Sequence, residues 1–360
     1  MAGTQTGEYY DSGGDLLPHK NPFLYQSGTI DHVYRKGRMT ADEEEMFHRW
    51  EEDMDREIGT EAEAETDDGL AEGDIKGLRT HWRPEENHLL GDDERARKLQ
   101  AVEAMAQAGA IVMYKELKDK ERVAARIAEE AGEEPPAPEA PPIPLFGGID
   151  LVKFAAAKEM PGEGDVISFE AWIRRKERKM VKGQTVAQLG DTMLANGVLK
   201  VRPVAARSGP VVFGMPVESA DPQERQHTSI FDRRSPNGIW LSGVTAENED
   251  RDSAEGFLLV DDEQTAGHVF AGQPVFPGVK QVGAFEDLMR FLRRDEELDL
   301  VALRDVAFTR VVKPTERLDL EVKVTRVKAP EGKVYRVAGI AVVAGVEACR
   351  ATLDFLPIAA

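Results

Sequence analysis

Apolar positions recur at spacings of three and four residues in two long stretches of the chain, 92–117 and 276–294. This spacing places apolar side chains on one side of a helix, so each stretch is predicted to be an amphipathic helix. The shared faces contain Leu99, Val102, Ala106, Ala110 and Ile111 in the first helix, and Val279, Val282, Phe285, Leu288, Met289 and Leu292 in the second.

Each predicted helix is followed by runs with alternating or continuous apolar character, which is typical of strands. The runs are 148–157, 165–175 and 183–204 after the first helix, and 300–312, 317–327 and 333–358 after the second. Asn196-Gly197 predicts a hairpin turn within the first group. A helix followed by antiparallel strands is an α+β arrangement. Because that order occurs twice, we predict a duplicated chain with domains at about 10–205 and 210–360.

Two segments interrupt this pattern. Between Asp42 and Asp74 there are 16 acidic residues, with only Arg49 and Arg56 as basic ones. Such a block is expected to stay solvated or to form a polar helix outside the core, and we assign it no chemistry. The segment 133–144, EEPPAPEAPPIP, is rich in proline, which lacks the backbone N–H that a helix needs. It is predicted to be an extended connector.

Charge and composition exclude several classes of function. The net charge of −20 argues against binding along a nucleic-acid backbone, which requires clustered lysine and arginine. No apolar run approaches the roughly 18–20 residues that span a bilayer. Cys349 is the single cysteine, so neither an intramolecular disulfide nor a cysteine-based metal site can form, and we expect it to be a small core residue. Because no secretory signal is visible, we expect a cytoplasmic protein. Histidines and acids do not occur at ligand spacing, so we expect no metal site. We also expect no cofactor.

Several segments resemble a known family in their sequence and in their shared order. These segments are 16–24 (LLPHKNPFL), 103–110 (EAMAQAGA), 146–150 (FGGID), 243–249 (GVTAENE) and 267–279 (GHVFAGQPVFPGV). They are similar to motifs of the FabZ-type (3R)-hydroxyacyl-[acyl-carrier-protein] dehydratases. The resemblance touches both halves of the chain. It implies two hotdog domains, each a curved antiparallel sheet around a long central helix, which pair as a pseudodimer.

The resemblance also implies a reaction and the residues that perform it. The family removes water from a (3R)-hydroxyacyl thioester with a histidine from one hotdog and an acid from the central helix of its partner. Histidines stand at the matching loop in both halves, at His268 and His88, whereas the acid position is Glu103 in the first half and Gly283 in the second. We therefore expect one complete site, His268 with Glu103, and an inactive one, His88 with Gly283. Because a helix N-terminus offers N–H donors, Gly278 and Val279 are expected to bind the thioester carbonyl, unless residues 97–101 do so.

The implied partner is an acyl carrier protein or its acyl thioesters, and the pseudodimer could form a homo-oligomer. Carrier proteins are acidic, so basic clusters are candidate docking residues, although each cluster could equally form a solvated face. Two other hypotheses remain open: a hydratase or thioesterase acting on coenzyme A thioesters, and a non-catalytic hotdog protein that binds acyl groups or acts as a scaffold. The basic clusters are 174–176, 178–179, 233–234, and Arg290 with 293–294.

Overall fold

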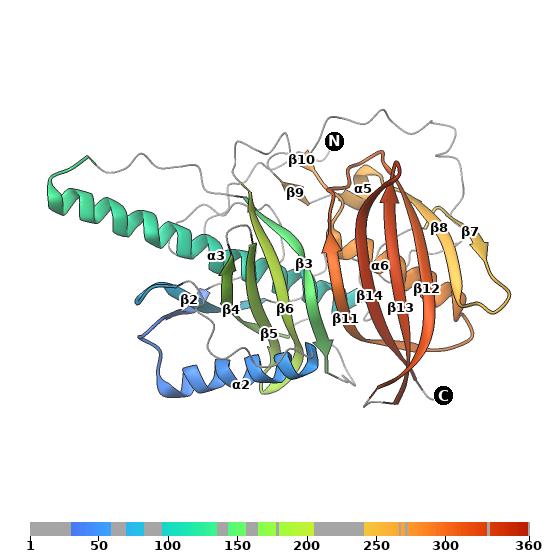
Figure 1. Ribbon diagram of the computed structural model, residues 1–360, viewed down its shortest axis with the longest axis horizontal. Coiled ribbons are helices and arrows are strands. Elements are labelled where there is room, and N and C mark those ends of the chain that lie inside the picture. The colour runs from blue at the N-terminus through green and yellow to red at the C-terminus, as the bar shows by residue number, and fades with distance from the viewer. Residues whose placement is uncertain are drawn as a thin grey trace.

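The computed structural model describes residues 30–58, 70–82, 96–134, 143–155, 165–177, 180–204, 241–265, 268–270, 273–329 and 332–358. Figure 1 shows the arrangement of their helices and strands. The helices are α2 (Ala41–Ile58), α3 (Ala96–Ala131), α5 (Asp262–Thr265) and α6 (Gly278–Leu292). The strands are β1 (Ile30–Arg35), β2 (Ile75–Trp82), β3 (Ile143–Phe154), β4 (Ile167–Glu177), β5 (Met180–Leu189), β6 (Thr192–Val204), β7 (Gly243–Glu247), β8 (Ser253–Leu259), β9 (Val269–Phe270), β10 (Gln273–Pro274), β11 (Leu298–Phe308), β12 (Arg317–Ala329), β13 (Gly332–Val343) and β14 (Val346–Pro357).

All the described strands except β9 and β10 form one 12-stranded sheet with antiparallel neighbours. From one edge the order is β1-β2-β4-β5-β6-β3, and from the other edge it is β7-β8-β12-β13-β14-β11. In the described part of each half, two strands of this sheet precede the long helix, and the strand after the helix lies at the centre of the sheet. This internal repeat in the topology confirms the predicted duplication of an α+β unit.

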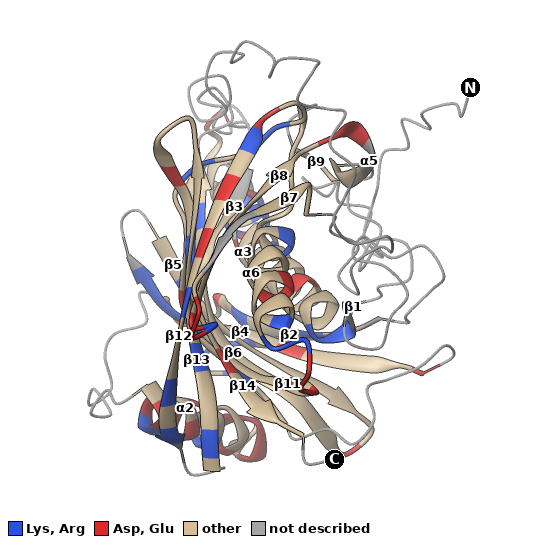
Figure 2. Ribbon diagram, turned by 90° about the vertical axis from the view of Figure 1, so that its right-hand side faces the viewer, with Lys and Arg blue, Asp and Glu red and all other residues tan. Residues whose placement is uncertain are grey.

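The two long helices lie side by side on the concave side of the curved sheet (Figure 2). Their apolar faces belong to the same buried cluster. Every residue predicted for the apolar face of α6 is buried, and on α3 the same holds for all but the half-buried Ala110. Cys349 is also fully buried, as expected for a core residue. A curved antiparallel sheet that wraps a long helix, formed twice, is the expected tandem hotdog fold.

The two halves of the sheet join directly through β3 and β11. The register pairs Gly148 with Ala307 and Lys153 with Ala302. A buried lysine of the first half adds a second connection, because Lys98 Nζ on α3 donates to a carboxylate oxygen of Asp299 and, at 2.8 Å, to the Leu300 carbonyl on β11. The seam between the halves is therefore held by both backbone and side-chain hydrogen bonds.

Helix α2 forms over the first part of the acidic block and covers the other face of the sheet (Figure 2). Thr40 and Glu43 form a reciprocal capping box, with the Glu43 N–H 3.3 Å from Thr40 Oγ1 and the Thr40 N–H 2.8 Å from Glu43 Oε2. Phe47, Trp50 and Met54 follow at helical spacing and are buried. The described part of the block thus forms a polar helix outside the main core, one of the two predicted outcomes, and this helix packs an apolar stripe on the sheet. Residues 59–69 of the block lie outside the described residues.

Met54 shows how far α2 extends across the sheet. It is 2% exposed and packs with Leu151, Val198 and Ala302, which belong to β3, β6 and β11. We expect Met54→Ala to lower the free energy of unfolding by about 2–3 kcal/mol, because it leaves a cavity beside the seam. Urea unfolding measures this change. Glu52→Ala, an exposed change on the same helix, should alter stability by less than about 0.5 kcal/mol, and equal effects would contradict the packing role of α2.

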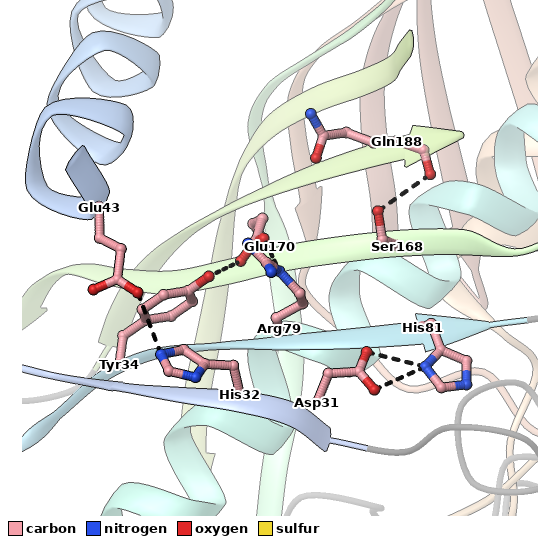
Figure 3. Close-up of polar contacts among 9 residues, drawn as sticks. All are labelled: Asp31, His32, Tyr34, Glu43, Arg79, His81, Ser168, Glu170 and Gln188. Atoms are coloured by element: carbon pink, nitrogen blue, oxygen red, sulfur yellow. Dashed lines mark hydrogen bonds and ion pairs between the residues drawn. The ribbon is translucent and has the colours of Figure 1, made fainter. Parts of the chain in front are cut away.

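Strands β1, β2 and β4 are linked by a buried polar network (Figure 3). The Tyr34 hydroxyl donates to Glu170 Oε2 at 2.8 Å, and Arg79 pairs with Glu170 Oε1. Burial raises the pKa of Glu170, whereas its contacts with Arg79 and Tyr34 lower it. At the rim of this network His32 pairs with Glu43 of α2 and His81 pairs with Asp31. The network fastens the outer strands and the start of α2.

One predicted turn is wrong, and other predictions fall outside the described residues. Asn196 and Gly197 lie inside β6 rather than at a hairpin turn. The Asn196 side chain accepts a hydrogen bond from Gln184 Nε2 at 2.8 Å, and a Cβ at Gly197 would stand 2.5 Å from Val152 Cγ2. The pair therefore serves packing rather than chain reversal. In the predicted connector, residues 143 and 144 begin β3, and 135–142 lie outside the description, as do 205–240 at the proposed domain boundary.

Candidate active site

Glu103 lies on the buried face of α3, between Val102 and Ala104, and is 6% exposed. Gln107 follows one turn later and donates a hydrogen bond from Nε2 to Glu103 Oε1 at 3.1 Å. Burial raises the pKa of Glu103, and the Gln107 contact lowers it to a smaller extent. Desolvation therefore favours the protonated carboxyl, which is the form that can donate a proton.

His268 lies between α5 and β9 and is 6% exposed. Its Nδ1 is 2.9 Å from the Val275 carbonyl oxygen, and the Val275 N–H donates back to the His268 carbonyl at 3.0 Å. Because a carbonyl only accepts, this contact assigns the proton to Nδ1 and leaves a lone pair on Nε2. Burial is the main cause that lowers the pKa of His268 to about 4. The ring is therefore neutral near pH 7, the form in which Nε2 can accept a proton.

The expected carbonyl-binding residues begin α6. Gly278 is the first helical residue, after Pro277, and Val279 is fully buried. A Cβ at Gly278 would stand 2.8 Å from the Phe308 ring, so glycine permits the helix to begin against this ring. The N–H groups of Gly278 and Val279 come before those that bond within the helix, and they lie at its positive end.

The structure positions the predicted site residues on neighbouring elements. Glu103 is on α3, which packs beside α6, and His268 is in the segment that leads into α6 (Figure 2). Gly283 is buried in α6, where it provides no carboxyl group. His88 lies outside the described residues. Of the two matched helix positions, only Glu103 therefore has a carboxyl side chain.

Two residues of the site were missed by sequence reasoning. Gln107 orients the Glu103 carboxyl, and its spacing of four residues on a helix was a usable signal. Val275 fixes the His268 ring through a backbone carbonyl, which leaves no trace in the sequence because any residue has one.

The described members of the basic clusters are largely occupied within the chain. Arg174 pairs with Asp55 at 2.7 Å, Lys176 pairs with Glu116, and Arg290 pairs with Glu286. Arg293 stacks over Tyr335 with 5.0 Å to the ring centroid. These contacts favour a structural role for the four residues over a docking role. The clusters at 178–179 and 233–234 lie outside the described residues.

Within the part of the chain that the structure describes, no group of three or more histidine, cysteine or carboxylate side chains is arranged to hold a metal ion. No helix in these described ranges is long and apolar enough to span a bilayer.

Comparison with known proteins identifies the family. A family profile described as ApeI-like, ApeI dehydratase, matches residues 246–344. The 3-hydroxyacyl-[acyl-carrier-protein] dehydratase FabZ of Bacillus pumilus is 34% identical over 137 residues, which is 36% of this chain and 92% of that protein. The chain belongs to the FabZ dehydratase family. FabZ of Bacillus velezensis is 32% identical over 139 residues, covering 36% of this chain and 94% of the relative.

A solved structure gives a weaker likeness. The 12:0-ACP thioesterase from Umbellularia californica is 12% identical, with a TM-score of 0.42, over 78% of this chain and 94% of that one. The FabZ relatives each match a length of about one hotdog domain, whereas this chain has two helix-and-sheet units. Membership of the FabZ family supports a hotdog enzyme of acyl thioesters, within the hydro-lyases.

Proposed function

We propose that the chain dehydrates (3R)-hydroxyacyl thioesters of an acyl carrier protein to trans-2-enoyl thioesters, at one composite site made by His268 and Glu103. The observation that carries this proposal is the opposite shift of the two pKa values. Burial lowers the pKa of the imidazole and raises the pKa of the carboxyl, so it favours the neutral form of each group. Two groups tuned in opposite directions are suited to act as a base and an acid in one reaction.

The proposed reaction balances with these two groups. His268 Nε2 takes the proton from C2 of the substrate, the C2–C3 double bond forms, and the C3–O bond breaks. Glu103 gives its proton to the departing hydroxyl, which leaves as water. The N–H groups of Gly278 and Val279 stabilise the negative charge that develops on the thioester oxygen. Transfer of one proton from the imidazolium to the carboxylate restores both groups.

The carrier-protein substrate rests on the names of the FabZ relatives. The experiment compares a (3R)-hydroxyacyl thioester of an acyl carrier protein with the same acyl group on coenzyme A. Enoyl formation is followed by mass spectrometry and thiol release by a colorimetric thiol reagent. We expect enoyl product without thiol release, and faster turnover with the carrier protein. Thiol release would favour a thioesterase, a preference for coenzyme A would favour a hydratase, and no turnover would favour an acyl-binding or scaffold protein.

A further inference from the structure

Lys280 is a buried lysine in the first turn of α6, 4% exposed. This is a costly place for an ammonium group, because burial removes its hydration and the helix N-terminus is itself positive. The side chain is therefore expected to have a contact that offsets this cost. Its Nζ donates a hydrogen bond to the Gln264 carbonyl oxygen at 2.7 Å.

The Gln264 carbonyl belongs to α5, the short helix that precedes His268. Gln264 is itself fixed to Asp261 by two reciprocal contacts: the Asp261 N–H donates to Gln264 Oε1 at 3.0 Å, and the Gln264 N–H donates to Asp261 Oδ1 at 2.8 Å. The carbonyl oxygen of the next residue, Thr265, accepts a hydrogen bond from the backbone N–H of His268 at 3.0 Å. A chain of contacts thus runs from Lys280 through α5 to the backbone of His268.

Lys280 also acts on the imidazole by its charge. After burial, which lowers the pKa of His268, and the Val275 carbonyl, which raises it, the ammonium of Lys280 lowers it further. Before the loop, Asp261 precedes α5 and Asp262 begins it, and both are exposed. On the neighbouring segment the Glu316 carboxylate pairs with Arg310 and accepts the Lys313 N–H. From α3, Glu103 is the acid proposed to share the site with His268.

The other half of the chain differs at this position. When Glu103 is paired with Gly283 along the two central helices, Lys280 corresponds to Gln100, which is also buried but neutral. The helix position therefore accepts a neutral polar side chain. At this matched position, α6 has the charged Lys280, and α6 is the helix that follows the loop with His268. The matched position of α3 has the neutral Gln100.

We propose that Lys280 is a positioning residue for His268: its ammonium holds α5 through the Gln264 carbonyl and thereby fixes where the imidazole stands. This inference rests on the proposed function, in which His268 Nε2 is the base. Lys280 makes no contact with substrate in this proposal. It acts through α5 and through the field of its charge.

The test is a measurement on the His268 ring that does not require turnover. Nitrogen-15 NMR of the full chain with labelled histidine gives the tautomer and the titration midpoint of His268, with His268→Ala to assign the signal. Lys280→Met should raise the midpoint by about 0.5–1 pH unit, because a nearby positive charge is lost. Lys280→Gln should do the same, while Lys280→Arg should keep the midpoint within about 0.3 unit because the charge remains.

Lys98→Met is the matched control. Lys98 is 5% exposed and also donates to a backbone carbonyl, but that carbonyl is Leu300 on β11 rather than one of α5. Its removal should leave the titration of His268 unchanged. If Lys280→Met and Lys280→Gln both leave the midpoint and the tautomer as in the wild type, the proposal is wrong. An equal change with Lys98→Met would also overturn it.

Turnover separates this proposal from the proposed function. If the chain is a dehydratase, Lys280→Met should lower kcat by about tenfold to a hundredfold with a smaller change in KM, and should move the acidic limb of the pH profile to higher pH. Lys280→Arg should recover most of kcat. If the wild type is a dehydratase and Lys280→Met leaves kcat and the pH profile unchanged, the positioning role is refuted but the proposed function is not. If the wild type has no turnover, the proposed function is refuted. The NMR titration then still tests whether Lys280 acts on the His268 ring.

Discussion

Glu103→Gln should reduce kcat/KM for dehydration by about 10²–10⁴-fold, and His268→Ala should reduce it by a similar factor, as expected for loss of a positioned acid or base. The glutamine keeps the shape of Glu103 and its place beside Gln107, but it cannot donate a proton to the leaving hydroxyl. Steady-state kinetics with a (3R)-hydroxyacyl carrier-protein thioester measure both losses. The double variant should be little worse than either single one, because the two groups act as a unit.

Glu116→Gln is the matched control on the same helix. Glu116 is as buried as Glu103, but it pairs with Lys120 and Lys176, and 13 residues of helix place it about 20 Å away. It should affect stability more than turnover. Loss of about half the activity in Glu103→Gln would reveal a second working site despite Gly283. Full activity in that variant would exclude Glu103 as the acid.

Glu103→Gln should also change stability, in a direction opposite to its effect on activity. The folded chain raises the pKa of Glu103 above its ordinary value of 4.5. The wild type therefore gains stability from this group at low pH and loses it as the pH rises from that value through the folded-state pKa. A neutral glutamine has no such loss. Thermal unfolding between pH 4 and 9 should show the variant gaining stability relative to the wild type as pH increases, and parallel curves would mean that Glu103 is not desolvated.

The fold could be predicted because its signals are local and repeated. The apolar faces of α3 and α6 follow the helical period, and the change to strand patterns after each helix occurs twice. The joining of both halves into one sheet through β3 and β11 is different, because it depends on pairing between residues about 150 positions apart. No periodicity within one segment encodes which strand lies opposite.

In two places tertiary contacts decide what a local signal did not show: at Asn196-Gly197 they override a turn signal, and at α2 they give a polar helix a buried stripe. Asn196-Gly197 has the composition of a turn, but Gln184 binds the asparagine side chain and Val152 crowds the glycine. The acidic block hides a helical stripe of Phe47, Trp50 and Met54. Its charge was a poor guide, because several of its carboxylates pair with the sheet: Asp55 with Arg174, and Glu57 with Lys153.

The candidate site also has features that the sequence predicts and features that depend on tertiary packing. The types and positions of Glu103 and His268 were visible through the resemblance, since their motifs are short and continuous. The features that set their protonation were not, because burial and a carbonyl contact arise only when distant segments pack together. Lys280 is the clearest case: in the sequence it lies off the predicted apolar face of the helix, and only its contact with the Gln264 carbonyl gives it a role.

The seam between the two halves leads to the prediction with the largest effect on stability. Gly148 lies on β3 opposite Ala307 of β11 and has a φ of 153°, a conformation that side chains rarely adopt. A Cβ there would stand 2.2 Å from the Val306 carbonyl oxygen, which is backbone and cannot move without disturbing the ladder. Gly148→Ala should therefore lower the free energy of unfolding by at least about 4 kcal/mol, from strain and from lost pairing at the seam.

The neighbouring glycine supplies the control for this prediction. A Cβ at Gly147 would be 3.5 Å from the Lys200 carbonyl oxygen, which is ordinary van der Waals contact. Gly147→Ala should change the free energy of unfolding by less than about 1 kcal/mol. Urea unfolding of the two variants therefore compares the same glycine-to-alanine substitution at adjacent positions. If Gly148→Ala unfolds like the wild type, β3 and β11 do not approach as closely as described. Because both halves are proposed to supply residues to one site, a chain weakened only at this seam should also lose turnover at lower urea concentrations than Gly147→Ala does.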